Sequence, residues 1–233
     1  MNNILQLKIE LEDINPKIWR RFLVKNNISF HDLHNIIQLV MGWENYHMFE
    51  FNINNETISS GKEGFNPAEG SFRKLFQSPE FIKMLEQQDP NKGSGILDVT
   101  KINKILKNAE KNKPKIKFNI DSKISELIKS SGQKFNYLYD FSDNWEHTIT
   151  VEKILDEKDV QECPFCLAGE RAYPPEDCGG VNGYYELIKI KKNRKHPEYE
   201  ERIIEWLGED FDFELIDINF INKKLKNIVR NLK

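Results

Sequence analysis

Residues 5–24 read LQLKIELEDINPKIWRRFLV, and this stretch decides what kind of fold the chain can form. In its first part, Leu or Ile alternates with charged or amide side chains at every second position. An alternation of period two is typical of a β-strand that buries one face against a core. After Pro16 a second run, IWRRFLV, continues as another strand. The stretch therefore predicts two successive strands of a sheet with one buried face.

The next segment predicts a helix and then a third strand. Ser29 can cap the helix, Asp32 lies in its first turn, and Gly42 stops it. Apolar side chains recur between them at helical spacing: Leu33, Ile36, Ile37, Val40 and Met41. Residues 46–53 then alternate aromatic and polar side chains, which favours a strand. The N-terminal part is thus expected to run strand, strand, helix, strand.

Residues 137–152 predict a β-hairpin whose turn is Ser142-Asp143-Asn144. One face of each strand would be buried, by Tyr137, Tyr139, Phe141, Trp145, His147, Ile149 and Val151. His147 should therefore point toward an apolar layer. Two helices are expected at the end of the chain, one opening at His196-Pro197 and one from about Asn219.

Together these elements predict an α+β fold, a mixed or antiparallel sheet with packed helices, plus a smaller and less regular central lobe. Residues 1–53 would form the N-terminal strand-strand-helix-strand part of the core. Residues 54–133 would form the inserted or appended lobe, with a helix start at Ser78. The lysine-rich run over residues 101–117 could be a solvated face or a basic phosphate-binding face, and the sequence favours the solvated face. Residues 134–233 would complete the core with the hairpin, a Cys/Pro/Gly loop and the C-terminal helices.

The composition limits the partners. The 233 residues carry 34 Lys and Arg against 37 Asp and Glu, a net charge of -3 that gives no overall attraction to nucleic acid or membrane. The first ten residues, MNNILQLKIE, lack a basic start followed by an apolar stretch, and no segment approaches the ~18 apolar residues that span a bilayer. We expect a cytoplasmic protein with no membrane partner. Nucleic acid is possible but not favoured, through Arg20, Arg21 and the central lysines.

Three cysteines suggest a structural zinc ion as a possible cofactor. Cys163 and Cys166 have the two-residue gap that lets both thiolates reach one zinc ion, and Cys178 follows across a Pro- and Gly-rich loop. Candidates for a fourth ligand are His147, His196, Glu176 and Asp177. The alternative is that the cysteines are small buried thiols that pack beneath the loop.

Acid/base chemistry is a second possibility. His147, Asp140 and Asp143 are the catalytic candidates, because a histidine oriented by a carboxylate is the usual proton shuttle. The structural alternative is that Asp143 organises the turn and His147 is a core residue with its hydrogen bonds satisfied. No serine nucleophile elbow, dinucleotide fingerprint or kinase signature occurs in the sequence.

Three blocks of sequence carry a family resemblance. They are INPKIWRRFLV with FHDLHNIIQLVMGWENYHMFEF, then YLYDFSDNWEHTITVEKI, then CLAGERAYPPEDCGGVNGYYELI with HPEYEERIIEWLGEDFD. The chain resembles the plasmid pRiA4b ORF-3-like family, whose members occur on plasmids and beside insertion sequences. The resemblance implies an α+β fold and no established activity, and the blocks leave the central lobe largely unmatched. This sequence departs from the family pattern at Ser142, where Gly is usual, and at Tyr173, where Cys is usual.

The positions shared with the family pattern extend the set of candidate residues. They are Trp19, Arg20, His34, Trp43, His47, Asp140, Asp143, Trp145, His147, Arg171, Glu176, Asp177 and Gly179. From them we expect a binding surface made by Arg20, Trp43, Asp143, Trp145, Arg171, Glu176 and Asp177. Loop carboxylates such as Glu176 are hard to explain by core packing, so they are the first candidates for a functional surface.

The hypothesis that follows is a binding or regulatory module carried by mobile elements. The hairpin turn and the PPEDCGG loop would meet to form a polar site for an unknown protein or small ligand. The alternatives are a small metal-dependent or acid/base enzyme and a nucleic-acid accessory protein. A solvent-reaching cleft that holds the carboxylates together with His147 would favour an enzyme, and a continuous basic face would favour nucleic acid.

Overall fold

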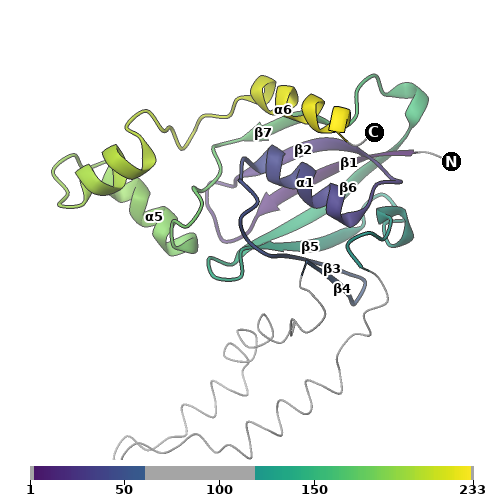
Figure 1. The fold of residues 1–233 in the computed structure, drawn as a ribbon, viewed down its shortest axis with the longest axis horizontal. Coiled ribbons are helices and arrows are strands. Elements are labelled where there is room, and N and C mark those ends of the chain that lie inside the picture. The colour runs from purple at the N-terminus through teal and green to yellow at the C-terminus, as the bar shows by residue number, and fades with distance from the viewer. Residues whose placement is uncertain (1–2, 61–118, 232–233) are drawn as a thin grey trace, which may run out of the picture. The chain divides into compact units, whose positions relative to one another are not determined.

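The computed structural model describes residues 3–60 and 119–231 (Figure 1). They contain a seven-stranded sheet in the order β4-β3-β5-β6-β1-β2-β7. Every neighbouring pair is antiparallel. The strands are β1 (Asn3–Leu11), β2 (Trp19–Lys25), β3 (Phe49–Ile53), β4 (Glu56–Ser59), β5 (Lys134–Tyr139), β6 (Trp145–Asp156) and β7 (Phe165–Glu170). With the helices described below, the sheet confirms the predicted α+β fold.

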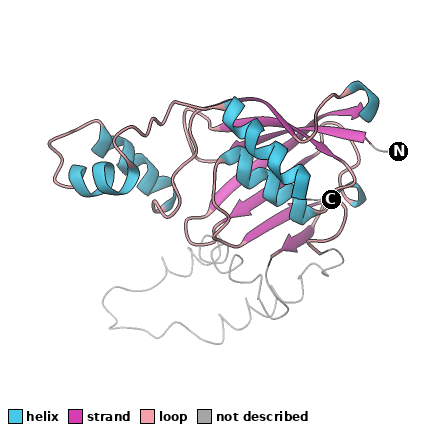
Figure 2. Ribbon diagram, turned by 45° about the horizontal axis from the view of Figure 1, so that its top comes forward, coloured by secondary structure: helices cyan, strands magenta, loops and turns pink. Residues whose placement is uncertain are grey.

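Two helices cover one face of the sheet, and two others lie to one side of it. Figure 2 shows two helices, α1 (Phe30–Met41) and α6 (Ile218–Asn231), lying over one face. Helix α5 (Gly180–Lys191) packs against a π-helix, η3 (Glu200–Leu207), to one side of the sheet (Figure 1). Two short 3₁₀ turns complete the described elements, η1 (Ile124–Glu126) and η2 (Glu157–Asp159).

The predicted helix start and stop of α1 are confirmed. Ser29 Oγ accepts a hydrogen bond from the backbone N of Asp32 at 3.0 Å, and the Asp32 carboxylate accepts one from the backbone N of Ser29 at 3.1 Å. This reciprocal capping box satisfies two of the donors that a helix start leaves free. Gly42 ends the helix with φ 97, a left-handed conformation that glycine adopts without strain.

The core lies between the sheet and the helices. The alternating residues of β1, Leu5, Leu7, Ile9 and Leu11, are all at most 1% exposed. The predicted inward face of β6 is buried in the same way, by Trp145, His147, Ile149 and Val151. Burying each aliphatic side chain contributes about 1.5–3 kcal/mol, so this alternation is the main reason that the sheet takes this register.

Three local predictions differ from the structure. The strand expected over residues 46–53 begins only at Phe49, because Asn45 takes a left-handed turn with φ 63 and the chain before Phe49 forms a loop. Strand β7 and helix α5 lie in a stretch that the sequence favoured as a loop. Strand β7 is short, contains Gly and Cys, and pairs only with β2 among the described strands, so it is an edge strand. Its sequence therefore lacks the strong hydrophobic alternation that would have predicted a strand.

The body formed by the described residues includes both ends of the predicted central lobe. Strand β4 belongs to the sheet, and the residues around η1 bond to the start of α1, with Phe30 N donating to Ser122 O. The expected helix start at Ser78 and the lysine-rich run over residues 101–117 lie outside the described residues.

Candidate functional site

Three connecting segments meet at one end of the sheet. They are residues 43–48 between α1 and β3, residues 140–144 between β5 and β6, and residues 171–179 between β7 and α5. Hydrogen bonds join them: Asp140 N donates to Met48 O at 3.0 Å, Gly179 N donates to Asp143 Oδ2 at 3.1 Å, and Trp43 Nε1 donates to Pro174 O at 3.0 Å. The hairpin turn and the PPEDCGG loop are therefore in direct contact.

A close backbone approach fixes the position of the third segment. Gly180 has φ 67, and a Cβ at this position would lie 2.6 Å from Asp143 O. Only glycine combines a left-handed conformation with so close an approach. The Gly179-Gly180 pair thus lets the start of α5 rest on the hairpin turn, which brings the acidic residues just before it toward Asp140.

Asp140 holds one carboxylate oxygen in place and leaves the other free. Its Oδ1 accepts hydrogen bonds from Ser142 N at 2.9 Å and from Ser142 Oγ at 2.6 Å. Its Oδ2 has no hydrogen-bond partner, although the side chain is only 3% exposed. The residue has φ 54, which Asp and Asn tolerate better than most other side chains.

Glu176 repeats this pattern. Its Oε1 accepts from Tyr139 Oη and from Glu44 N, both at 2.9 Å, while its Oε2 has no partner. Burial raises the pKa of Glu176 above its ordinary value, and burial also raises the pKa of Tyr139 well above its usual range, so the phenol remains a donor. Tyr139 is itself held by stacking on Trp43, with ring centroids 4.7 Å apart.

The imidazole of His47 faces both free oxygens. Its Nε2 lies 3.7 Å from Asp140 Oδ2, 3.9 Å from Glu176 Oε2 and 3.1 Å from Asp177 Oδ1. None of these contacts has hydrogen-bond geometry, so Nε2 also has no hydrogen-bond partner. The side chain of Asp177 is 68% exposed, which leaves this side of the cluster open to solvent. We call His47, Asp140, Glu176 and Asp177 the acidic cluster.

The chemistry of the acidic cluster suits a positive charge. Buried polar atoms nearly always find partners, and a buried carboxylate is costly unless it is paired. Here Asp140 Oδ2 and Glu176 Oε2, which lack hydrogen-bond partners, both lie near His47 Nε2. A cation bound there could pair with these atoms, and the nitrogen and carboxylate donors are ligands that metal ions accept.

Arg20, expected at a binding surface, lies in the core. It is 1% exposed and donates to four backbone carbonyls, those of Trp19, Val40, Glu170 and Arg171, at 2.8–2.9 Å. Burial lowers the pKa of Arg20 to about 10. Its position joins the end of α1 to the end of β7, so its role in the described structure is to fasten these elements together.

Arg171 and the two tryptophans also point inward. Arg171 forms two hydrogen bonds to the carboxylate of Glu214, at 2.9 and 2.6 Å, and a third to Pro16 O at 3.0 Å. Trp43 and Trp145 are 4% and 0% exposed. These side chains support the loops from behind and do not present a surface.

The predicted catalytic set does not come together. His147 is 1% exposed on the inward face of β6, where its Nδ1 lies 3.2 Å from Tyr137 O, and burial lowers its pKa to about 4. Asp143 accepts from Gly179 N and is not a member of the acidic cluster. The physical reason is register: the alternation that buries His147 directs it away from the turn that carries Asp140.

The three cysteines likewise do not share a site. Among the described residues, the group of His, Cys, Asp and Glu side chains close enough to share a metal ion contains His47, Asp140 and Asp177 and no cysteine. Cys166 lies on β7, Cys178 precedes α5, and both are buried. Burial raises the pKa of Cys163 and Cys178 to about 12 and that of Cys166 to about 11, which keeps the thiols protonated.

His47 is the residue that the expected site left out. It is shared with the family pattern, but the alternation over residues 46–53 placed it within a strand. A nearby signal was the sequence Trp43-Glu44-Asn45, because Asn readily adopts the left-handed conformation that ends the alternation and turns His47 toward the hairpin. Tyr139, whose hydroxyl donates to Glu176, is predicted from the sequence only as part of the buried face of the hairpin.

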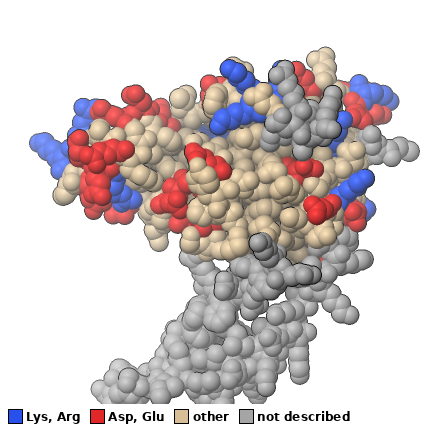
Figure 3. Space-filling view, in the orientation of Figure 1, with Lys and Arg blue, Asp and Glu red and all other residues tan. Residues whose placement is uncertain are grey.

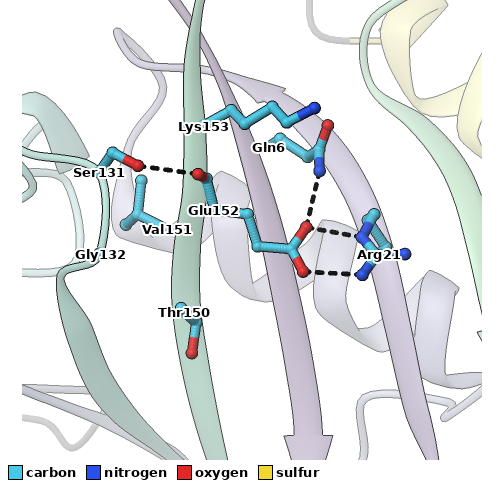
Figure 4. A pocket seen from close by; sticks show the side chains of 8 residues that line it. All are labelled: Gln6, Arg21, Ser131, Gly132, Thr150, Val151, Glu152 and Lys153. Carbon is cyan, nitrogen blue, oxygen red and sulfur yellow. Dashed lines mark hydrogen bonds and ion pairs between the residues drawn. The ribbon is translucent and has the colours of Figure 1, made fainter.

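A hollow lies on the outer face of the sheet. Figure 4 shows that Gln6, Arg21, Glu152 and Lys153 border it. The Glu152 carboxylate accepts from Arg21 at 2.6 and 2.8 Å and from Gln6 at 2.6 Å. Arg21 and Glu152 are therefore already paired with each other, and we do not assign a ligand to the hollow.

Two further observations concern the other classes of partner. None of the described helices is both long and apolar enough to cross a membrane. On the face drawn in Figure 3, the lysines and arginines of the described residues are scattered among acidic and neutral side chains. That face does not offer the continuous basic surface typical of nucleic-acid binding.

Comparisons with known proteins give a family, a relative and a solved structure, and none of these three comes with a described activity. The family described as "Plasmid pRiA4b ORF-3-like protein" matches residues 3–220, a span that includes the central stretch. The uncharacterized protein y4hQ of Sinorhizobium fredii is 26% identical over 227 residues, which are 97% of this chain and 92% of that protein. The crystal structure of MM3350 from Methanosarcina mazei Go1, a protein of unknown function, is 30% identical, with a TM-score of 0.66 over 94% of this chain and 97% of that chain.

Proposed function

The chain belongs to the plasmid pRiA4b ORF-3-like family, and we propose that it is a binding module whose acidic cluster takes a positively charged ligand. The ligand enters where the hairpin turn, the PPEDCGG loop and the loop after α1 meet. The proposal keeps the binding-module hypothesis and adds that the ligand is positively charged.

One observation carries the proposal: His47 Nε2, Asp140 Oδ2 and Glu176 Oε2 are buried and lack hydrogen-bond partners, and both oxygens lie within 3.9 Å of the nitrogen. A buried polar atom without a partner costs about 1–3 kcal/mol, and more when it is charged. The other oxygen of Asp140 is bonded to Ser142 in the same turn, and the other oxygen of Glu176 is bonded to Tyr139 and Glu44 from neighbouring segments. The free oxygens are thus held in fixed directions, as expected of a preorganised binding site.

The rim of the acidic cluster supports access from solvent. Asp177 is 68% exposed by side chain and Tyr46 is 70% exposed. An exposed aromatic ring beside carboxylates suits a cationic ligand, through cation–π attraction as well as charge. An acid/base enzyme that uses His147 has less support, because that residue is 1% exposed.

The test is a thermal-shift screen of the full chain with cations of different classes: divalent metal ions, spermidine and an arginine-rich peptide. We expect at least one of them to raise the melting temperature through binding to the native state. The shift should disappear in Asp140→Asn and remain in Asp143→Asn, which makes the same chemical change in the same turn. A screen with no shift, or a shift that Asp140→Asn retains, would contradict the proposal.

A further inference from the structure

We infer, on the basis of the proposed cation site, that its ligand is a single first-row divalent transition-metal ion. The ion would be bound by Nε2 of His47 and by carboxylate oxygens of Asp140, Glu176 and Asp177.

The spacing of the donor atoms fits an ion. Donors that surround one tetrahedral ion at ~2.0–2.2 Å lie about 3.4 Å from one another. His47 Nε2 lies 3.1 Å, 3.7 Å and 3.9 Å from oxygens of Asp177, Asp140 and Glu176. The ligand atoms of His47, Asp140 and Asp177 all lie within 4.8 Å of one another. Glu176 is not part of that group, so its Oε2, 3.9 Å from His47 Nε2, would have to move closer to bind the same ion.

A second observation, independent of the clustering of acidic residues, points to a ligand. The Asp140 side chain is 3% exposed, and its partnerless Oδ2 is aimed into the cluster toward His47. Its other oxygen is held by Ser142, and the bonded oxygen of Glu176 is held by Tyr139 and by Glu44 N. Such outer hydrogen bonds to ligating carboxylates are characteristic of metal sites, where they fix the direction of the free lone pairs.

The donor set narrows the choice of metal. One imidazole nitrogen with carboxylate oxygens suits Mn²⁺, Fe²⁺, Co²⁺ or Zn²⁺, whereas Mg²⁺ and Ca²⁺ prefer oxygen donors alone. No thiol joins the group among the described residues, so a soft ion such as Cu(I) is not favoured. A divalent ion also offsets two of the three carboxylate charges.

The closing experiment titrates the metal alone into chelator-treated, tag-free full-length protein, and measures heat and bound metal. We expect one equivalent of Zn²⁺ or Mn²⁺ per chain and much weaker binding of Mg²⁺. Asp140→Asn and Glu176→Gln should each weaken binding by at least about 100-fold, because each removes a direct ligand and even outer partners are worth 10–100-fold. Both variants keep an oxygen for the hydrogen bonds from Ser142 or Tyr139, so they are designed to fold, and circular dichroism checks this.

Two matched controls separate this site from other metal ligands. Asp143→Asn changes a carboxylate in the same turn, and Cys178→Ala removes a thiol from the next loop; both should bind metal as the wild type does. Equal binding by wild type, Asp140→Asn and Glu176→Gln would overturn the inference. Loss of metal binding in Cys178→Ala would also overturn it, in favour of a thiolate site.

The outcome also distinguishes this inference from the broader proposal. If no metal binds but spermidine or the arginine-rich peptide binds, and Asp140→Asn abolishes that binding, then the metal inference fails and the cationic binding module stands. If none of these cations binds, both fail.

Discussion

Two buried charged groups lie near the same loop and are treated in opposite ways. Arg20 donates to four backbone carbonyls, one of them that of Arg171 at the start of the loop. Asp140, which faces the other end of that loop, satisfies Oδ1 and leaves Oδ2 without a partner. Both side chains are at most 3% exposed, so burial alone does not distinguish them.

The difference shows what each group does. A buried charge whose hydrogen bonds are complete serves the fold, because water has been replaced by fixed partners. A buried acceptor that is held in place and lacks a hydrogen-bond partner is the kind of group that a bound water or ion would complete. Other buried atoms among the described residues also lack partners, including His147 Nε2 and Tyr184 Oη, but they do not join a group of potential ligands. Convergence, more than the missing bond, marks the acidic cluster.

The largest effect should come from breaking the complete network. Arg20→Ala leaves several backbone carbonyls without a donor and opens a space between α1 and β7, so we expect the free energy of unfolding to fall by about 3–5 kcal/mol. Urea denaturation followed by circular dichroism measures this. The neighbouring Arg21→Ala is the control: Arg21 pairs with Glu152 at the surface, and its loss should cost about 1 kcal/mol or less. Similar losses for the two variants would refute the structural role of Arg20.

Lowering the pH should reduce the free energy of unfolding by a smaller amount. Burial lowers the pKa of His147 and of His34 to about 4 from 6.5, so below pH 6.5 the unfolded chain takes up protons that the folded chain does not. Stability is therefore complete above pH 6.5 and falls as the pH drops from 6.5 toward 4. Each histidine should remove about 1.5 kcal/mol between pH 6.5 and pH 5. Denaturation curves at both pH values measure the loss.

His147→Asn provides the control for this pH dependence. Asn does not titrate and can still donate to Tyr137 O, the partner of His147 Nδ1. The variant should keep only the part of the pH dependence that His34 and the carboxylates supply. An unchanged difference between pH 6.5 and pH 5 would show that His147 is protonated equally in both states.

A still smaller effect is expected for Cys178. It is 4% exposed, and burial keeps it a protonated thiol, so Cys178→Ala should cost about 1 kcal/mol through lost packing. Melting curves of wild type and variant should respond equally to a chelator. A destabilisation by chelator that occurs in the wild type and is absent in the variant would restore the zinc hypothesis for the cysteines.

How far the sequence could predict the molecule depends on whether a pattern repeats. The buried faces of β1, α1 and β6 follow from a period of two or 3.6, and the capping box at Ser29 is a local pattern with one physical meaning. The turn and loop carrying Asp140 and Glu176 could also be singled out, as carboxylates that core packing does not explain. The orientation of these two carboxylates could not be predicted. It depends on hydrogen bonds from Tyr139 to one oxygen of Glu176 and from Ser142 to one oxygen of Asp140.

His47 shows the limit most clearly. Its aromatic neighbours continue the alternation of β3, and only the left-handed Asn45 removes it from the strand. Arg20 shows the reverse error, since a charged side chain in a strand was expected at a surface although four carbonyls from three segments were available to bury it. The burial of Arg20 depends on contacts between distant segments, which no local pattern encodes, whereas the turn before His47 has a local signal in Asn45.

The smallest expected effect on stability is the most informative, and it comes from Asp140→Asn in metal-free protein. Asn tolerates the left-handed φ of 54 at this position, and its oxygen can still accept from Ser142 N and Oγ. The change removes one of the negative charges beside Glu176 and replaces the partnerless Oδ2 with an amide that can donate. We therefore expect the free energy of unfolding to stay within about 0.5 kcal/mol or to rise, as is usual for substitutions that disturb no structural contact. A buried charge that served the fold would behave as Arg20 does. A loss of more than about 2 kcal/mol in metal-free Asp140→Asn would place Asp140 in that class, and the acidic cluster would then need a structural explanation.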